Sequence, residues 1–226
     1  MSKKTTNKNL DENFFAKFGP AKLYKKDQLI IEPGKEPAGV FFIKKGYVRL
    51  YTISKEGKEI TYNIYKPGMY FPLIWALNQT HNIYFIEAIT DTQVLKAPRD
   101  EVINVLKKNP DLLFILTQNA FSGLEGITKL MDSLLSKNAY RQICSILVTL
   151  TVRFGKVDGK KMIIDVPLTH RVLGTLAGLS REATSRELEK LSKEKIISLT
   201  DHKITILNYK KLQEEFLSNA SEHINF

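Results

Sequence analysis

The sequence predicts an α+β fold in which an N-terminal β-roll is followed by a long helix and a C-terminal winged helix-turn-helix. Three patterns indicate this order. Residues 21–96 contain short runs of β-branched and aromatic residues between regularly spaced glycines, which is typical of a roll or sandwich. Residues 111–137 carry apolar side chains three and four positions apart. Residues 169–207 hold two short helical segments joined by Gly178 and followed by a hairpin pattern.

The β-roll is expected over residues 19–108, after a flexible tail at residues 1–18. Its clearest strands are Val40–Ile43, Tyr47–Ile53 and Glu59–Tyr65. Lys45-Gly46 lies between the first two strands and has the composition of a hairpin turn. A short helix, Arg99–Lys108, closes the domain because Asn109-Pro110 is unfavourable for its continuation.

The long helix is expected over residues 109–137, with Asp111 near its start. Its regularly spaced apolar residues are Leu113, Leu116, Ala120, Leu124, Ile127, Met131 and Leu134. This spacing is that of a coiled-coil seam, so the helix is expected to hold a homodimer together. Packing of the seam against the chain's own roll is the alternative.

The C-terminal domain is expected over residues 138–217, with a tail at residues 218–226. Asn138 is a natural cap for a helix over Tyr140–Phe154, and a hairpin follows around Asp158-Gly159. Thr169 and Ser180 cap the two helices of the helix-turn-helix. A second hairpin, with strands at residues 196–199 and 203–207, forms the wing.

The second helix of this motif carries side chains that suit the major groove of DNA. Arginine can bond bidentately to guanine, and glutamate can accept from the amino group of cytosine. An ion pair between Glu182 and Arg186 on a solvated face is the alternative, and the two roles can coexist. The residues expected to contact DNA, including phosphate contacts from the wing tip, are Thr169, Arg171, Ser180, Arg181, Glu182, Thr184, Ser185, Arg186, His202 and Lys203.

Composition limits the possible partners, the location and the cysteine chemistry of the protein. A net charge of +10 permits an anionic partner, although a generally basic set of proteins would explain it equally well. No run of eighteen apolar residues and no secretory signal is seen, so a cytoplasmic location without membrane association is expected. The single cysteine, Cys144, excludes an intramolecular disulfide and a four-thiolate iron–sulfur cluster. It is interpreted as a buried core residue, with a redox role as the alternative.

Residues 21–209 resemble the Crp/Fnr family of bacterial transcription regulators. The resemblance is carried by Gly39–Leu50 and Lys66–Phe71 in the roll and by Leu168–Leu188 in the helix-turn-helix. It implies a homodimer that binds an inverted repeat of double-stranded DNA, with a TGA core in each half-site, and RNA polymerase as a partner. Arg181, Glu182 and Arg186 match the base-reading set of the cyclic-AMP-responsive members. Glu182, Ser185 and Arg186 match that of the oxygen-responsive members, while Ala183 replaces a common hydroxyl residue.

The effector site departs from the family's pattern for cyclic nucleotides. Phe71-Pro72 stands where Gly-Glu is usual, and residues 80–87 contain no arginine, Asn82-Ile83 being the nearest equivalent. Cyclic AMP or cyclic GMP is therefore not expected, and no cofactor is expected. A pocket for another, unknown effector is the hypothesis, with packing in the core of the roll as the alternative. Its expected residues are Tyr70, Phe71, Trp75, Asn82 and Tyr84.

Two other functions are alternatives to a DNA-binding regulator. A ligand-sensing roll without a role in gene regulation is disfavoured because the winged helix is intact while the nucleotide pattern is lost. An enzyme is not expected, because the sequence offers no metal-spaced set, no nucleophile with a plausible base and no phosphate-binding glycine loop. His81 is interpreted as a surface-loop residue rather than a haem ligand.

Overall fold

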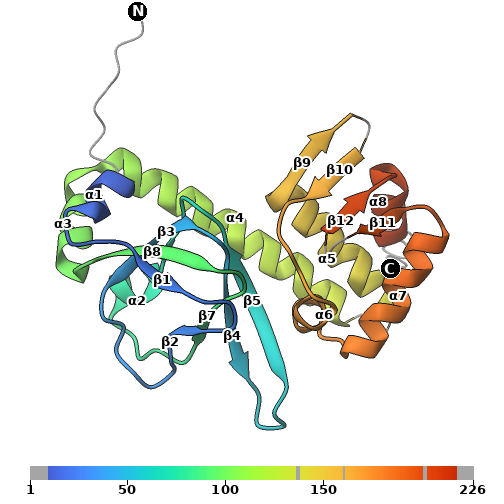
Figure 1. Cartoon of the computed structure of the whole chain (residues 1–226), viewed down its shortest axis with the longest axis horizontal. Coiled ribbons are helices and arrows are strands. Elements are labelled where there is room, and N and C mark those ends of the chain that lie inside the picture. Colours follow the sequence, from blue (N-terminus) through green and yellow to red (C-terminus); the bar gives the residue numbers. More distant parts are fainter. Residues whose placement is uncertain (1–9, 136–137, 160, 201–202, 218–226) are drawn as a thin grey trace, which may run out of the picture. The chain divides into compact units, whose positions relative to one another are not determined.

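The computed structural model describes residues 10–135, 138–159, 161–200 and 203–217 (Figure 1). The chain divides into two compact units, residues 1–121 and residues 122–226. Each unit is described by itself below.

The first unit is a β-roll of two four-stranded antiparallel sheets, as the sequence predicts. Its strands are β1 (Lys22–Tyr24), β2 (Leu29–Ile31), β3 (Val40–Lys45), β4 (Val48–Ile53), β5 (Glu59–Tyr65), β6 (Tyr70–Phe71), β7 (Phe85–Ala88) and β8 (Thr92–Ala97). The strand orders are β1-β8-β3-β6 and β2-β7-β4-β5. Large apolar side chains such as Phe41, Ile43 and Ile86 fill the space between the sheets. The β3–β4 turn needs Gly46, whose φ is +91° and whose absent side chain would collide with Thr92.

Two short helices of this unit were not predicted. Helix α1 (Glu12–Ala16) begins at Asp11, whose carboxylate accepts from the Phe14 N–H at 2.9 Å. Its Phe15 is fully buried and stacks on Phe42 with ring centroids 5.4 Å apart. The prediction of a flexible tail is therefore wrong for residues 10–18, because burial of Leu10 and Phe15 anchors this segment to the roll. Helix α2 (Leu73–Asn78) follows β6, in a region read from the sequence as strands.

Helix α3 (Arg99–Lys108) has the predicted bounds, and helix α4 (Pro110–Leu135) follows it directly. The expected seam of α4 is only partly covered in one chain. Leu116 packs with Leu112 against the apolar cluster of the roll, whereas Leu113 and Leu124 are exposed. The remaining expected seam residues Ile127, Met131 and Leu134 have side chains outside the described residues.

The exposed apolar side of α4 is wider than predicted. Phe114 and Phe121 are 64% and 63% exposed, and neither belongs to the expected seam. Successive helical residues are about 100° apart, so these two lie on the same side as Leu113 and Leu124. We call these four residues the α4 apolar face. Leu116 is covered by the roll, whereas Leu113 and Leu124 of the predicted seam are uncovered in one chain together with Phe114 and Phe121.

The second unit is a winged helix-turn-helix, as predicted. Its elements are α5 (Ala139–Phe154), β9 (Gly155–Asp158), β10 (Lys161–Ile164), α6 (His170–Ala177), α7 (Arg181–Lys193), β11 (Ile197–Thr200), β12 (Lys203–Ile206) and α8 (Tyr209–Leu217). The strands form one sheet in the order β11-β12-β10-β9, because the two predicted hairpins pair through β10 and β12. Asn138, Thr169 and Ser180 cap α5, α6 and α7 as expected.

Candidate DNA interface and effector pocket

Helices α6 and α7 are held at close range by a small turn. Gly178 ends α6 with a φ of +69°, the left-handed conformation that glycine adopts without steric cost. Gly174 faces the turn so closely that a side-chain carbon there would lie 2.8 Å from the Leu179 carbonyl oxygen. The Thr184 hydroxyl donates to the Ser180 carbonyl oxygen at 2.8 Å. These contacts fix how α7 projects from the unit.

Helix α7 has one buried and one exposed side. Leu188 and Leu191 are fully buried, whereas Arg181, Glu182 and Arg186 are exposed on the other side. The buried leucines fix the rotation of the helix about its own axis. The exposed side of α7 therefore presents two guanidinium groups and one carboxylate on a helix of fixed rotation. Their side chains are long enough to reach base edges.

Glu182 and Arg186 have different partners in the structure. The Arg186 Nε donates to Glu187 at 3.2 Å, so the pair with Glu182 considered from the sequence is not formed here. A hydrogen bond from its own backbone N–H and one from Ser180 hold the pKa of Glu182 below its usual value. Glu182 is thus a charged acceptor at neutral pH.

Three of the residues expected to contact DNA also have structural roles. The hydroxyls of Thr169 and Ser180 accept backbone N–H groups as helix caps. Thr184 is fully buried, because its position on α7 faces α6, so its side chain does not reach the exposed side of the helix. Arg171 and Lys203 are exposed. His202 lies outside the described residues.

One residue of this surface was missed in the sequence. His170 begins α6, and its Nδ1 lies 2.6 Å from the Ser185 Oγ on α7. Both side chains are half-buried. A histidine next to the predicted cap Thr169 was the available signal, but only the packing of α6 on α7 brings it to Ser185.

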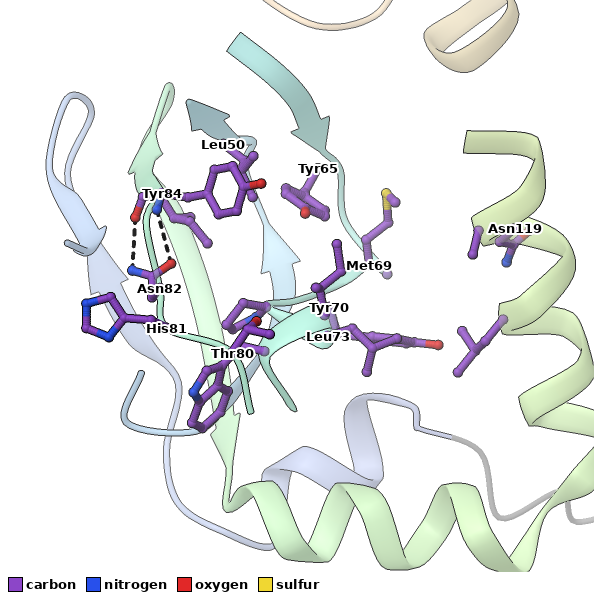
Figure 2. Close-up of a pocket in the computed structure, with 17 residues that line it drawn as sticks. Leu50, Tyr65, Met69, Tyr70, Leu73, Thr80, His81, Asn82, Tyr84 and Asn119 are labelled. Atoms are coloured by element: carbon purple, nitrogen blue, oxygen red, sulfur yellow. Dashed lines mark hydrogen bonds between the residues drawn. The ribbon is translucent and has the colours of Figure 1, made fainter. Parts of the chain in front are cut away.

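A cavity of about 320 Å³ lies in the first unit, and Figure 2 shows the 17 residues that line it. Tyr70, Trp75, Asn82 and Tyr84 contribute to its wall as expected from the sequence. Phe71, also expected there, lies instead in the core between the sheets, stacked on Phe41 at 5.5 Å. Because strand residues alternate in direction, Tyr70 and Phe71 cannot both face the cavity.

The polar groups of the cavity come from two sides. In Figure 2 Asn119 projects from α4, opposite the loop that carries His81 and Asn82. The Asn82 amide donates to the carbonyl oxygens of Glu32 and Tyr84 at 2.8 and 3.0 Å, and its oxygen accepts the Tyr84 N–H. Asn82 therefore shapes the loop. Burial raises the pKa of Tyr70, so its hydroxyl remains a neutral donor and acceptor.

Cys144 is fully buried on α5, as expected for a core residue. Burial, with the nearby carboxylates of Glu215 and Glu194, raises the pKa of its thiol to about 12. Because the thiolate is the reactive form, the native protein should react with Ellman's reagent at pH 8 at least about a hundredfold more slowly than the urea-unfolded chain. Comparable rates in the two states would contradict the inert assignment.

Among the residues that the structure describes, no cluster of three or more His, Cys, Asp and Glu side chains is placed to hold a metal ion. Within the same ranges no helix is long and apolar enough to cross a bilayer.

Two family models match the chain. Residues 21–109 match the cyclic nucleotide-binding domain, and residues 141–215 match the Crp-like helix-turn-helix domain. These segments coincide with the β-roll and its closing helix, and with the winged helix-turn-helix.

Curated relatives match along most of the chain. A global nitrogen regulator from Nostoc sp. is 27% identical over 195 residues, covering 85% of this chain and 87% of the relative. The fumarate and nitrate reduction regulatory protein of Vibrio cholerae is 25% identical and covers 84% and 75%. Both relatives are regulatory proteins, which agrees with the expectation that the chain is not an enzyme.

Solved structures share the whole fold. FixK2 from Bradyrhizobium japonicum superposes with a TM-score of 0.73 at 22% identity, covering 86% of this chain and 96% of that one. A CooA mutant from Carboxydothermus hydrogenoformans superposes with a TM-score of 0.71 at 23% identity, covering 86% of each chain. With both domain models in the family's order and the fold of its members, the chain belongs to the Crp/Fnr family of DNA-binding transcription regulators.

Proposed function

We propose that the protein is a homodimeric regulator that reads an inverted-repeat DNA site through Arg181, Glu182, Ser185 and Arg186. The observation that carries this proposal is the exposed side of α7, whose rotation is fixed by buried Leu188 and Leu191. By resemblance, each half-site has a TGA core and RNA polymerase is a partner. Selection from a random duplex library should return such an inverted repeat. A selected pool without any repeated motif would overturn the proposal.

Replacement of Glu182 by alanine should relax base preference more than it lowers general affinity. The Glu182 carboxylate is a charged acceptor suited to a base amino group, whereas it repels phosphate. We expect discrimination at one half-site position to fall by about five- to a hundredfold, while binding to random DNA holds or improves. Competition binding of the variant against a set of single-base substitutions of the selected site measures this. Equal losses on selected and random DNA would contradict base reading.

Dimerisation is proposed to occur through the α4 apolar face. Leu113, Phe114, Phe121 and Leu124 leave large apolar side chains in water along one side of a single helix, the situation that helix pairing relieves. The double variant Phe114→Glu/Phe121→Glu should be monomeric at micromolar concentration in light scattering, because it would bury like charges in the interface. Its affinity for the inverted repeat should fall at least about a hundredfold, because two half-sites are no longer bound together.

A matched control separates this effect from added negative charge. Ser122 is exposed on the same helix, away from the apolar face. Ser122→Glu is expected to stay dimeric and to bind DNA as the unmodified protein does. If the Phe114→Glu/Phe121→Glu protein remained dimeric, the dimer contact would lie elsewhere and the proposed interface would be wrong.

The cavity beside α4 is proposed as the effector pocket. Leu116, Asn119 and Ala120 line it from the same helix that carries the α4 apolar face. A ligand that contacts these residues can therefore bias the helix on which the dimer depends. Cyclic AMP, which the matched domain model suggests, does not fit well, because none of the lining residues is lysine or arginine.

A further inference from the structure

From the lining of the cavity we infer the chemical class of the effector: an uncharged, largely apolar molecule with an aromatic or similarly flat body. This inference deepens the proposed sensing role of the roll. The wall contains Tyr65, Tyr70, Trp75 and Tyr84, with aliphatic side chains between them. Flat aromatic surfaces of this kind favour flat apolar ligands.

Charge is what the cavity lacks. Its 17 lining residues include no Asp, Glu, Lys or Arg. An ion that enters a partly buried site loses hydration, and the lining offers no permanent charge to compensate that loss; His81, its one histidine, is exposed to solvent. Tyrosine hydroxyls and the Asn119 amide can instead serve as donors and acceptors for neutral polar groups. The lining therefore selects against anions such as a cyclic phosphate.

A pair of probes that differ only in charge tests this inference. Naphthalene-2-carboxamide and naphthalene-2-carboxylate have the same ring system, and calorimetry on the full chain without DNA compares them. We expect the amide to bind at least about tenfold more tightly than the carboxylate, and cyclic AMP to bind no better than the carboxylate. Tighter binding of either anion, or no binding of the amide at millimolar concentration, would overturn the inference. Because DNA is absent, such a failure leaves the proposed DNA-binding role intact.

Two variants and one control test whether the probes bind in this cavity. Ala120→Trp fills the cavity from α4 and should abolish amide binding, while Gln118→Trp on the exposed part of the same helix should not. Asn119→Arg supplies the missing cation and should reverse the preference toward the carboxylate. Unchanged preference in Asn119→Arg would show that the probes bind elsewhere, which also overturns the assignment.

A second observation carries a separate proposal about the DNA-reading surface. We propose that His170 is a positioning residue that sets the hydrogen-bonding character of Ser185. The two side chains are 2.6 Å apart, and Ser185 lies between Arg181 and Arg186 on the reading side of α7. This proposal rests on the proposed base-reading role of Ser185.

The chemical reason is that a hydroxyl has one proton to donate. If Ser185 donates to the His170 Nδ1, its oxygen can only accept from DNA. If Nδ1–H donates to Ser185, the serine hydroxyl can donate to a base acceptor such as a purine N7. His170 therefore decides which base edge Ser185 can recognise, without itself touching that edge.

Selection of DNA sites by variants tests this role. Ser185→Ala and His170→Phe should change base preference at the same half-site position, by about fivefold, and the double variant should change it no further. His170→Asn, which can keep a polar atom near the Nδ1 position, should restore part of the preference. Binding to random DNA should change less than twofold in all of them.

Three outcomes would overturn the positioning role. His170→Phe could leave every base preference intact, or it could lower binding to selected and random DNA alike, which indicates a phosphate contact or a structural role. The effects of the two single variants could also add in full. Failure of the unmodified protein to select any motif would instead reject the proposed function, so the two failures are distinguishable.

Discussion

Replacing both Arg181 and Arg186 by alanine should abolish sequence-specific DNA binding while the fold remains intact. Both side chains are exposed on α7, and within the described part of the chain Arg186 pairs with Glu187 at 3.2 Å. Each bidentate arginine–guanine contact contributes about 1–3 kcal/mol of discrimination, so loss of both should lower affinity for the selected site at least about thirtyfold per half-site. Fluorescence anisotropy with the selected duplex measures the loss, and circular dichroism checks the helix content.

The control must remove the same charge from the same unit. Lys193→Ala/Lys210→Ala takes two exposed cations from α7 and α8 without touching the first turns of α7. This variant should lose only the affinity that it also loses on random DNA, because general attraction to phosphate is not sequence-specific. If the two double variants behaved alike, the arginines would act by charge alone.

Arg49→Met should destabilise the β-roll by about 3–5 kcal/mol, the usual result of removing one partner from a buried ion pair. Arg49 is fully buried on β4, donates to Glu59 at 2.6 Å and to Glu87 at 3.1 Å, and lies over the Tyr51 ring. Burial by itself lowers the pKa of Arg49, but its hydrogen bonds to the two glutamates outweigh that effect and leave the pKa raised. Without this cation two carboxylates would face each other with no positive charge between them.

Urea denaturation followed by circular dichroism measures this loss of stability. A triple variant identifies its cause. Adding Glu59→Gln and Glu87→Gln to Arg49→Met removes the uncompensated charges and should recover most of the stability. A loss below about 1 kcal/mol in the single variant would show that the cluster is solvated enough to tolerate the change. A triple variant as unstable as the single one would assign the loss to packing rather than charge.

Features that depend on neighbouring residues in the chain were predictable. Arg99–Lys108 was predicted with its observed bounds because Asn109-Pro110 is a strong local signal. The caps at Asn138, Thr169 and Ser180 depend on hydrogen bonds to an N–H only three residues away. The reading side of α7 follows from helical periodicity in the same way.

Features that depend on packing between distant segments were not predictable. The partial covering of α4 is one example, because the periodicity of an apolar helix does not say which of its residues the roll will cover, and Leu116 of the expected seam is covered. The cavity joins Tyr84, in a loop, to Asn119, on α4, and His170 meets Ser185 only after α6 packs on α7. In each case the missing information was a tertiary contact, which outweighs local preference.

The position of Trp75 has an optical consequence. It is the single tryptophan of the chain, nearly buried in the wall of the roll's cavity, and the second unit contains none. Its emission therefore reports on the first unit alone, whereas ellipticity reports on both. If the two units unfold independently, the two signals will give separate transitions in denaturant; if the units unfold together, the curves will coincide. Unfolding of the β-roll can thus be observed apart from that of the winged helix-turn-helix without any added label.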